Sequence, residues 1–313
     1  MNKLPSVYQI EVFSRCNLRC PFCLTGIVNK PPEYLASAMD MQLFQTIVDR
    51  DLGNTRFLEL QMRGEPTLHK NLLAMVRMIT DKGILVGFST HGGTLARNNK
   101  ALCAALNCHY VTISIDAGTK EGYEAKRVGG NWESVIEGIS KLIEFKGDED
   151  FPIIDLQLIE ENYGPNTWQR ELTALEDLAF DLAWERHVNI RTLPNSNLRW
   201  KDPTASIDKS AELCLNPWLS VSIKANGDVV PCCMSFEDDP AMLYGNLADQ
   251  SLEEIWASPT VEKFRMLHTQ AAGHGQTGLP KACADCTNRS PVLFHDNLIL
   301  NALSNQIGIK KDV

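Results

Sequence analysis

Between residue 7 and about residue 200, short β-like runs alternate regularly with helical stretches. Runs rich in β-branched and aromatic residues indicate strands, and apolar residues at helical spacing indicate the helices between them. The predicted strands cover residues 7–13, 56–62, 84–90, 110–116, 151–159 and 187–193. The predicted helices cover residues 41–51, 68–82, 98–107, 131–145 and 167–182. This alternation is typical of a parallel sheet with helices outside it. Because six strands are fewer than the eight of a closed barrel, we predict an α/β fold with a partial, open, TIM-like (β/α)6 barrel.

The pattern changes after residue 200. Residues 194–213 are polar and interrupted by prolines, which indicates a linker. Further on, two β-like runs flank Asn226-Gly227, a strong hairpin signal, and a helical stretch begins near Ser251. We therefore predict a barrel domain over residues 1–200, a small second domain over residues 201–290 and a C-terminal tail over residues 291–313.

The composition excludes some partners. The 313 residues include 30 Lys and Arg against 39 Asp and Glu, which gives a net charge of −9. An acidic surface repels phosphates, so we expect no nucleic-acid partner. No apolar run reaches the length of a membrane helix, and the N-terminus lacks the apolar core of a secretory signal. We expect a cytoplasmic protein with no membrane partner.

Most of the ten cysteines fall into two groups, one near each end of the chain. In a reducing compartment, grouped cysteines indicate metal binding or catalysis more often than disulfides. Cys16, Cys20 and Cys23 form a C-x3-C-x2-C loop directly after the first predicted strand. Three thiolates suit three irons of a [4Fe–4S] cluster and leave the fourth iron open to another ligand. A structural zinc site fits less well, because zinc there takes four protein ligands.

The second group supplies four thiols, Cys214, Cys232, Cys283 and Cys286, which would close a cluster or a zinc site completely. Such a site is expected to transfer electrons or to brace the fold. Cys233 follows directly, and if Cys232 is the ligand, side-chain alternation along a strand turns Cys233 away, toward the barrel mouth. A thiol there can give a hydrogen atom to a carbon radical. The alternatives are a small buried apolar residue or a substitute ligand.

These features resemble the radical S-adenosylmethionine (SAM) superfamily. In that family the pattern C-x3-C-x-φ-C follows the first strand of a partial (β/α)6 barrel, and here Phe22 occupies the apolar position of the pattern. The resemblance implies that the first cysteine group holds a [4Fe–4S] cluster that binds SAM through its open iron.

The resemblance also implies SAM-binding residues at the ends of later strands. The family's Gly-Gly-Glu-like motif, which binds the SAM amino group, is matched after the second predicted strand by Arg63-Gly64-Glu65. Glu65 is thereby assigned to the amino group. Arg63 departs from the family's first Gly and is a candidate for contact with a substrate, as is Arg191 near the end of the sixth strand.

Two further positions on the fourth predicted strand match the family's ribose-binding strand. They are Ser114 and Asp116. Arg127, in the stretch that follows, matches the residue that steadies the SAM carboxylate. The resemblance thus implies that these three residues contact bound SAM.

The second cysteine group resembles the start of the SPASM/twitch domains of the same superfamily, with Gly227 between Cys214 and Cys232 at the family's spacing. Four cysteines match the short form, which carries one auxiliary [4Fe–4S] cluster. The resemblance therefore favours a cluster over a zinc site at these cysteines. The resemblance therefore implies SAM, two [4Fe–4S] clusters and an electron donor of the flavodoxin or ferredoxin type.

The superfamily's shared step is reductive cleavage of SAM to a 5′-deoxyadenosyl radical, which abstracts a hydrogen atom from the substrate. Hydrogen return from a thiol to the opposite face would give epimerisation. Loss of an electron from an alcohol-centred radical to the auxiliary cluster would give a ketone. The chain resembles twitch-type enzymes of aminoglycoside biosynthesis, in which both reactions occur.

The doubled Cys232-Cys233 favours the first outcome. We therefore predict an epimerase that inverts a stereocentre of an aminoglycoside or a related sugar or cyclitol, with Cys233 as hydrogen donor. A dehydrogenase of aminocyclitols or sugar alcohols is the alternative. A peptide-modifying SPASM enzyme ranks third, because the first strand begins near residue 7 and leaves no room before it for a leader-binding domain, and a non-enzymatic metal-binding protein ranks last.

Overall fold

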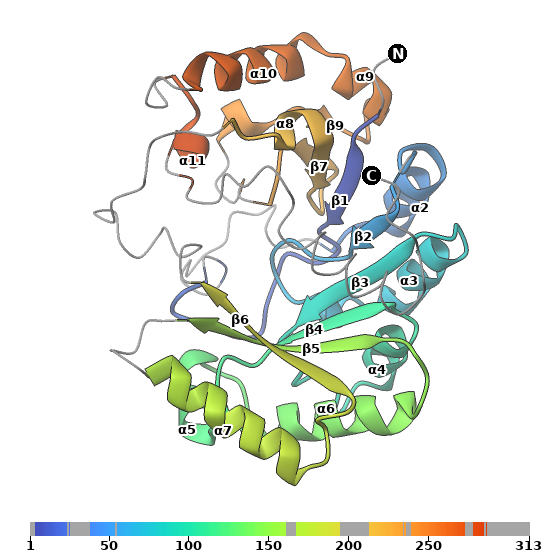
Figure 1. Ribbon diagram of the computed structural model, residues 1–313. Coiled ribbons are helices and arrows are strands. Elements are labelled where there is room, and N and C mark those ends of the chain that lie inside the picture. The colour runs from blue at the N-terminus through green and yellow to red at the C-terminus, as the bar shows by residue number, and fades with distance from the viewer. Residues whose placement is uncertain are drawn as a thin grey trace.

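A single mixed sheet runs through the whole molecule. The computed structural model describes residues 4–23, 25, 38–53, 55–160, 167–194, 213–233, 235, 239–272, 278–284 and 286. Within these ranges the sheet has nine strands in the order β6-β5-β4-β3-β2-β1-β7-β8-β9. Figure 1 shows the sheet curving through the molecule, with helices on its outer side.

All six predicted barrel strands form, and each pairs in parallel with the next along the chain. They are β1 (Ser6–Ile10), β2 (Phe57–Glu59), β3 (Leu85–Thr90), β4 (Tyr110–Ser114), β5 (Ile153–Glu160) and β6 (Val188–Pro194). In the described sheet β6 and β1 are not paired with each other, so the barrel is open. The prediction of a partial (β/α)6 barrel is confirmed.

The barrel helices begin where polar side chains cap them. They are α2 (Met41–Arg50), α3 (Leu72–Thr80), α4 (Asn99–Leu106), the short α5 (Lys120–Lys126), α6 (Trp132–Lys146) and α7 (Thr167–Asp181). Asp40, Asn98 and Asn131 each accept a hydrogen bond from a backbone N–H in the first turn of α2, α4 and α6. The predicted helix at 68–82 begins later, because residues 66–68 form a 3-10 turn first.

The two faces of the barrel sheet differ in chemistry. Residues that face the helices, such as Leu58, Phe88 and Ile113, belong to the main apolar core. On the inner face, Tyr8, Phe57, Tyr110 and Ile153 form a separate apolar cluster near the start of the strands. Two residues further along β2, β4 and β5, the same inner face becomes polar and stays buried, at Glu59, Thr112 and Asp155. The barrel interior therefore has an apolar floor beneath polar layers.

The C-terminal part continues the same sheet. β7 (Ser220–Ile223) pairs in parallel with β1, and β8 (Asp228–Val230) and β9 (Gly245–Asn246) follow in antiparallel register. The predicted hairpin turn at Asn226-Gly227 is confirmed, with Gly227 at a φ of 89°. The helices of this part are α8 (Asn216–Leu219), α9 (Leu252–Trp256), α10 (Pro259–Ala271) and α11 (Lys281–Ala284). Most of the predicted linker and the whole predicted tail lie outside the described residues.

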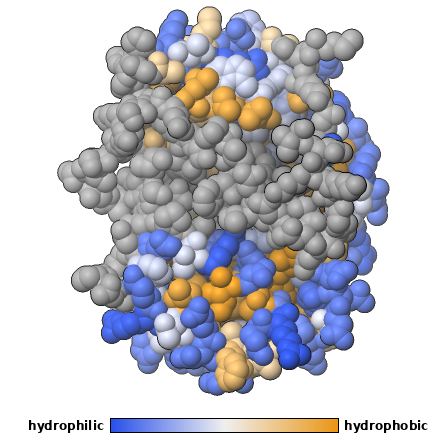
Figure 2. All heavy atoms as spheres, in the orientation of Figure 1, coloured by the Kyte–Doolittle hydropathy of each residue, from blue (hydrophilic) through white to orange (hydrophobic). Residues whose placement is uncertain are grey.

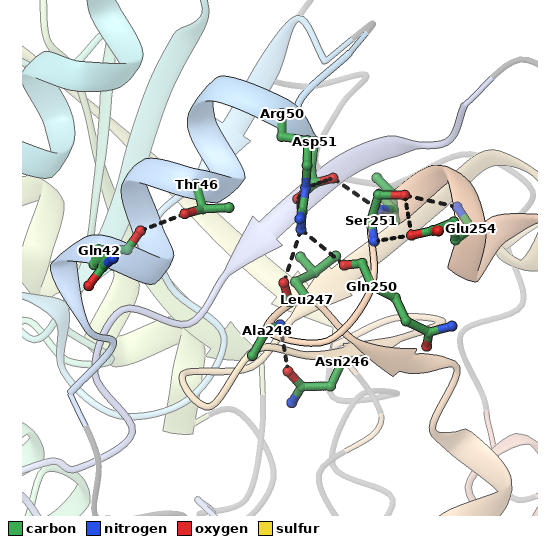
Figure 3. A network of polar contacts seen from close by, with 11 residues as sticks. Gln42, Thr46, Arg50, Asp51, Asn246, Leu247, Ala248, Gln250, Ser251 and Glu254 are labelled. Atoms are coloured by element: carbon green, nitrogen blue, oxygen red, sulfur yellow. Dashed lines mark hydrogen bonds and ion pairs between the residues drawn. The ribbon is translucent and has the colours of Figure 1, made fainter.

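A polar junction joins α2 to the loop before α9 (Figure 3). Arg50 Nη2 donates to the carbonyl oxygens of Leu247 at 2.9 Å and Gln250 at 3.0 Å. Its neighbour Asp51, which is buried, accepts a hydrogen bond from the backbone N–H of Leu252 at 2.9 Å. Ser251 then begins α9 with a capping box. The junction fastens the C-terminal elements to the outside of the barrel.

The surface has the mixed character of a folded domain. Figure 2 shows hydrophilic residues over much of the visible face, with apolar residues gathered in the region of α7 and in the C-terminal half. Phe180 and Leu182, at the end of α7, are among the exposed large apolar side chains. None of the described helices is long and apolar enough to cross a membrane.

Candidate functional site

The loop of the first cysteine group leaves the end of β1 and turns tightly on itself. The backbone N–H of Cys23 donates to the carbonyl of Cys20 at 3.1 Å, and the N–H of Leu18 donates to Cys16 Sγ at 3.3 Å. Leu18, Cys20 and Phe22 are buried together in a small cluster, against which Cys16 and Cys23 pack. The structure thus brings the three predicted ligands onto one short loop, as the spacing required.

Burial raises the pKa of the Cys16 thiol to about 12, and the nearby Glu65, Cys20 and Cys23 add to the effect. Burial also raises the pKa of Cys20. Thiols in such surroundings become thiolates when a positive centre such as iron compensates their charge. Among the described residues, no three His, Cys, Asp or Glu side chains surround a position for one metal ion. A cubane is larger than one ion and takes its thiolates at separate corners, and three thiols on one loop suit three of those corners.

Gly64, in the segment after β2, lies directly against the backbone that leads into this loop. Its φ is +72°, and a Cβ there would lie 2.1 Å from the carbonyl oxygen of Phe13 and 2.7 Å from that of Arg15. The next residue, Glu65, donates its backbone N–H to the Arg15 carbonyl at 2.8 Å. No other residue type fits at Gly64 without moving the backbone, so this glycine sets the position of Glu65 relative to Cys16.

The carboxylate of Glu65 is buried and held in place by several donors. Its Oε1 accepts hydrogen bonds from Thr67 N at 3.1 Å, Thr67 Oγ1 at 2.5 Å and Thr90 Oγ1 at 2.7 Å. Its Oε2 accepts from His91 N at 2.9 Å. Since a carboxylate oxygen can accept a second hydrogen bond, Oε2 keeps a position for an ammonium group. The arrangement fits the predicted contact with the SAM amino group.

His91 ties this carboxylate to the cysteine loop, a role that the sequence did not reveal. Its Nδ1 accepts a hydrogen bond from Gly93 N at 3.1 Å, so the neutral ring carries its proton on Nε2. Nε2 then donates to Asn17 Oδ1 at 2.9 Å. Asn17 lies between Cys16 and Cys20. The only signal for this link in the sequence was the position of His91 directly after the third strand.

Asp116 and Arg127 form an ion pair beside the cysteine loop. Although burial opposes the charge of the guanidinium, Asp116 holds the pKa of Arg127 above its ordinary value. Arg127 also donates to Cys20 Sγ at 3.8 Å, and its guanidinium lies 5.2 Å from the ring centre of Phe22. The structure brings these four predicted residues together at one place.

The finer assignments on the fourth strand stay predictions. Asp116, at a φ of 57°, has Oδ2 on Arg127 and accepts a hydrogen bond from Ile159 N on Oδ1 at 3.0 Å. Ser114 is half-buried at the end of β4, in register with Gln157. Both residues lie at the carboxyl end of a parallel strand, where ligands of such sheets bind.

Arg63 and Arg191 lie inside the barrel, each against a carboxylate. Arg63 Nε is 2.7 Å from Glu11 Oε2, and both side chains are buried. Arg191 Nε is 2.9 Å from Asp155 Oδ2, and Asp155 also accepts a hydrogen bond from the Tyr110 hydroxyl at 2.6 Å. The guanidinium of Arg63 is therefore already engaged by Glu11, and its predicted contact with a substrate stays a prediction, as does that of Arg191.

The second cysteine group also assembles. Burial raises the pKa of Cys232 well above its ordinary value, and the charges of Cys233, Cys283, Cys214 and Cys286 around it add to the effect. These thiols come from the segment before α8, the turn after β8, and α11 with the residue beyond it. All ten cysteines lie in the described residues as thiols. Five of them meet here, one more than a closed cluster takes.

The predicted strand through Cys232 and Cys233 was wrong. β8 ends at Val230, and the two cysteines lie in the turn that follows it. Pro231 stands between, and because proline has no N–H for the ladder, it ends the strand. The alternation argument for the direction of Cys233 therefore does not apply, and its role as hydrogen donor stays a prediction.

An open barrel with a three-cysteine loop at its mouth and a second cysteine group beside it defines an iron–sulfur protein of the radical SAM class. Comparison with known families agrees. The radical SAM superfamily matches residues 10–156, and the SPASM family, an iron-sulfur cluster-binding domain, matches residues 214–287. The chain belongs to the radical SAM superfamily and carries a SPASM domain. It is an enzyme that binds SAM and a [4Fe–4S] cluster in the barrel and auxiliary iron–sulfur in the SPASM domain.

Several known proteins are similar to it over most of their length. A tungsten-containing aldehyde ferredoxin oxidoreductase cofactor-modifying protein of Pyrococcus furiosus is 24% identical, over 95% of this chain and 91% of its own. The SAM-dependent 2-deoxy-scyllo-inosamine dehydrogenase of Niallia circulans is 23% identical, over 93% and 96%.

Two solved structures share the fold. BtrN in complex with AdoMet and 2-DOIA matches with a TM-score of 0.50 at 18% identity, over 92% of this chain and 94% of its own. SuiB of Streptococcus suis bound to S-adenosylmethionine matches with a TM-score of 0.58 at 13% identity, over 85% and 68%.

Proposed function

We propose that this enzyme is an epimerase that inverts one carbon stereocentre of a small, hydroxylated, amine-bearing molecule such as an aminoglycoside, sugar or cyclitol. SAM bound at the open iron supplies the 5′-deoxyadenosyl radical, which takes the hydrogen atom from the substrate carbon. Cys233 gives its thiol hydrogen to the opposite face of that carbon. The sulfur then needs one electron and one proton to become a thiol again, and a flavodoxin- or ferredoxin-type donor would supply the electron.

The polar interior of the barrel supports a small hydrophilic substrate. Two buried ion pairs, Glu11 with Arg63 and Asp155 with Arg191, stand on the inner face above the apolar floor. Buried charges and amides of this kind are matched by a ligand that offers hydroxyl and amine groups. An apolar ligand would offer these groups no further hydrogen bonds.

The observation that carries epimerisation is the fifth thiol of the second cysteine group. A closed cluster takes four thiolates, and five thiols gather here. The proposal takes Cys233, half-buried in the turn after β8, as the additional one. A thiol beside an electron-transfer centre is suited to give a hydrogen atom and then to be reduced.

A dehydrogenase is the second candidate, and the relative from Niallia circulans favours it. That protein is by name a 2-deoxy-scyllo-inosamine dehydrogenase, and the two chains align over nearly their whole lengths. In this reading the auxiliary centre takes the second electron from an alcohol-centred radical, and the product is a ketone. Peptide modification ranks below both, since the likeness to SuiB, which is known in complex with a precursor peptide, extends to the fold alone.

Turnover in D2O separates the two candidates. The anaerobically reconstituted protein is given SAM, reductant and a panel of aminoglycosides, sugars and cyclitols, and the products are examined by mass spectrometry and NMR. An epimerase places one solvent deuteron at an inverted carbon, because the thiol exchanges with solvent. A ketone without deuterium would establish the dehydrogenase instead.

Cys233→Ala tests the hydrogen donor. This variant should still form 5′-deoxyadenosine but no epimer, because the substrate radical has no hydrogen source on the opposite face. Cys103→Ala, which removes an exposed thiol of α4, is the matched control and should retain the wild-type yield. An unchanged epimer yield in Cys233→Ala would remove that residue from the mechanism.

A further inference from the structure

Three buried polar side chains form one layer of the barrel wall, on the adjoining strands β2, β1 and β7 (Figure 1). Gln9 is in register with Glu59 on one side and with Ser222 on the other. Their exposed fractions are 5%, 2% and 1%. The layer lies above the apolar floor and is separate from the residues that surround the cysteine loop.

Glu59 brings a carboxylate into this layer without a cation beside it. It accepts hydrogen bonds from Gln9 Nε2 at 2.8 Å and, more weakly, from Gln61 Nε2 at 3.5 Å. The nearby guanidinium of Arg63 is paired with Glu11 instead. Among the described residues no basic group lies within ion-pair distance of Glu59. A buried carboxylate whose only partners are amides lacks the paired cation that buried charged groups of proteins usually have.

Two further atoms of the layer lack partners. Gln9 Oε1 and Ser222 Oγ are buried and have no hydrogen-bond partner in the described structure. The orientation of the Gln9 amide is set by this bond, because the NH2 end faces the Glu59 carboxylate, and Oε1 therefore points away from that carboxylate. Nearly all buried polar atoms of native proteins are hydrogen-bonded, so two orphans beside an uncompensated carboxylate indicate a missing ligand.

We propose that this layer binds a primary ammonium group of the substrate. An ammonium has one positive charge and three N–H donors. The charge compensates Glu59, and the donors match the carboxylate, Gln9 Oε1 and Ser222 Oγ. The inference rests on the proposed function in placing a small substrate inside the barrel, and it narrows the substrate class to amines whose ammonium group contacts the β1–β2–β7 wall.

A further buried polar atom without a hydrogen-bond partner, on a different strand, offers the substrate another polar contact. Arg191 Nη1 is buried and without a hydrogen-bond partner, whereas Nη2 donates to Thr112 Oγ1 and Gln157 Oε1, each at 3.4 Å. A guanidinium N–H there suits an oxygen acceptor such as a hydroxyl group. The interior thus offers acceptors on β1, β2 and β7 and a donor on β6, which is the pattern that an amino alcohol satisfies.

The first test needs no ligand. Glu59→Gln removes an uncompensated charge at constant shape, so the melting temperature of the ligand-free protein should stay equal or rise, by up to about 4 °C. Asp51→Asn is the matched control, because it neutralises a buried carboxylate that does have a cation partner, Arg50, and it should lower the melting temperature. A fall for Glu59→Gln as large as that for Asp51→Asn would mean that Glu59 is already satisfied, and would overturn the proposal.

The second test uses matched ligands on the SAM-loaded holoenzyme. The probes are 2-deoxy-scyllo-inosamine and glucosamine, each compared by calorimetric titration with the molecule in which a hydroxyl replaces the amine. The wild-type protein should bind at least one amine about tenfold or more tightly than its alcohol, since a charge-assisted hydrogen bond is worth that much. Glu59→Gln should abolish the preference. Equal binding of amines and alcohols, or no binding of any probe, would overturn the ammonium site.

These results can be told apart from a failure of the proposed function. If turnover in D2O yields a ketone, the epimerase proposal fails while an amine preference in the titration still supports the ammonium site. If an epimer forms from substrates with and without an amine at equal KM, the epimerase stands and the ammonium site fails.

Discussion

Gly64 illustrates how one residue decides the geometry of the SAM site. The glycine combines a left-handed φ of +72° with an approach so close that any Cβ would enter the backbone of residues 13–15. The same backbone leads directly to Cys16, and Glu65 follows on the other side. The separation of the first ligand and the buried carboxylate is therefore set by a residue with no side chain.

We expect Gly64→Ala to disrupt the first cluster. The Cβ pushes residues 13–15 away and moves the three-cysteine loop with them, so iron content after reconstitution should fall from roughly eight to roughly four per chain. Gly83→Ala is a matched control, because Gly83 has the same φ of +72° and nothing within 4 Å of an added Cβ. It bears only the conformational strain, about 1–2 kcal/mol. Equal iron contents in the two variants would show that the close contact does not position the loop.

At the level of single residues, the sequence indicated candidate ligands, but it did not indicate which residues surround them. The cysteines were candidates because of their spacing and their position in the chain, and Glu65 was a candidate through the resemblance to the family. The donors to Glu65 were not, since Thr90 and His91 are common residue types that become partners only when β2 and β3 pair. Ion pairs in the barrel interior, such as Arg63 with Glu11, escape prediction for the same reason.

The predicted strands and helices formed where the hydrophobic periodicity and the capping residues indicated the same element. An error arose where the backbone of a single residue ended a strand. Pro231 ended β8 ahead of the two adjacent cysteines, although the β-like run continues through them. The parallel pairing of β7 with β1 was not predicted either. The two strands are separated by about 200 residues, and nothing local in either sequence specifies such a partner.

The junction between α2 and α9 is the contact between elements that we expect to matter most for stability. Arg50→Ala removes both hydrogen bonds to the C-terminal loop and leaves buried Asp51 without its cation, so the free energy of unfolding should fall by about 1–3 kcal/mol. Lys82→Ala, which breaks an exposed ion pair with Asp49, should change it by less than about 1 kcal/mol. Chemical denaturation of the two variants measures the difference, and equal effects would assign the junction no special role.

For the whole molecule, the continuous sheet makes the barrel and the SPASM domain one folding unit. β1 is hydrogen-bonded to β2 on one side and to β7 on the other, so neither part can unfold without exposing an edge of the other. The sequence predicted a domain boundary near residue 200 because its pattern changes there, and that boundary stays a prediction. A change of pattern does not indicate whether the sheet continues.

We therefore expect a single cooperative transition when the holoenzyme unfolds. Differential scanning calorimetry should give one peak, with equal calorimetric and van't Hoff enthalpies, and Arg50→Ala should move that peak as a whole. Two resolved peaks, with only one of them displaced by the substitution, would show that the parts unfold independently.

The shared strand also bears on how the two iron–sulfur centres communicate. The first loop leaves the end of β1. One segment of the second group, the turn with Cys232 and Cys233, follows β8, which pairs with β7, the direct neighbour of β1. Among the described residues, the β1–β7 backbone ladder connects the parts of the fold that carry the two binding sites. We therefore expect the separation of the two centres, and with it the rate of electron transfer between them, to be set by the backbone and to stay unchanged when side chains inside the barrel are substituted.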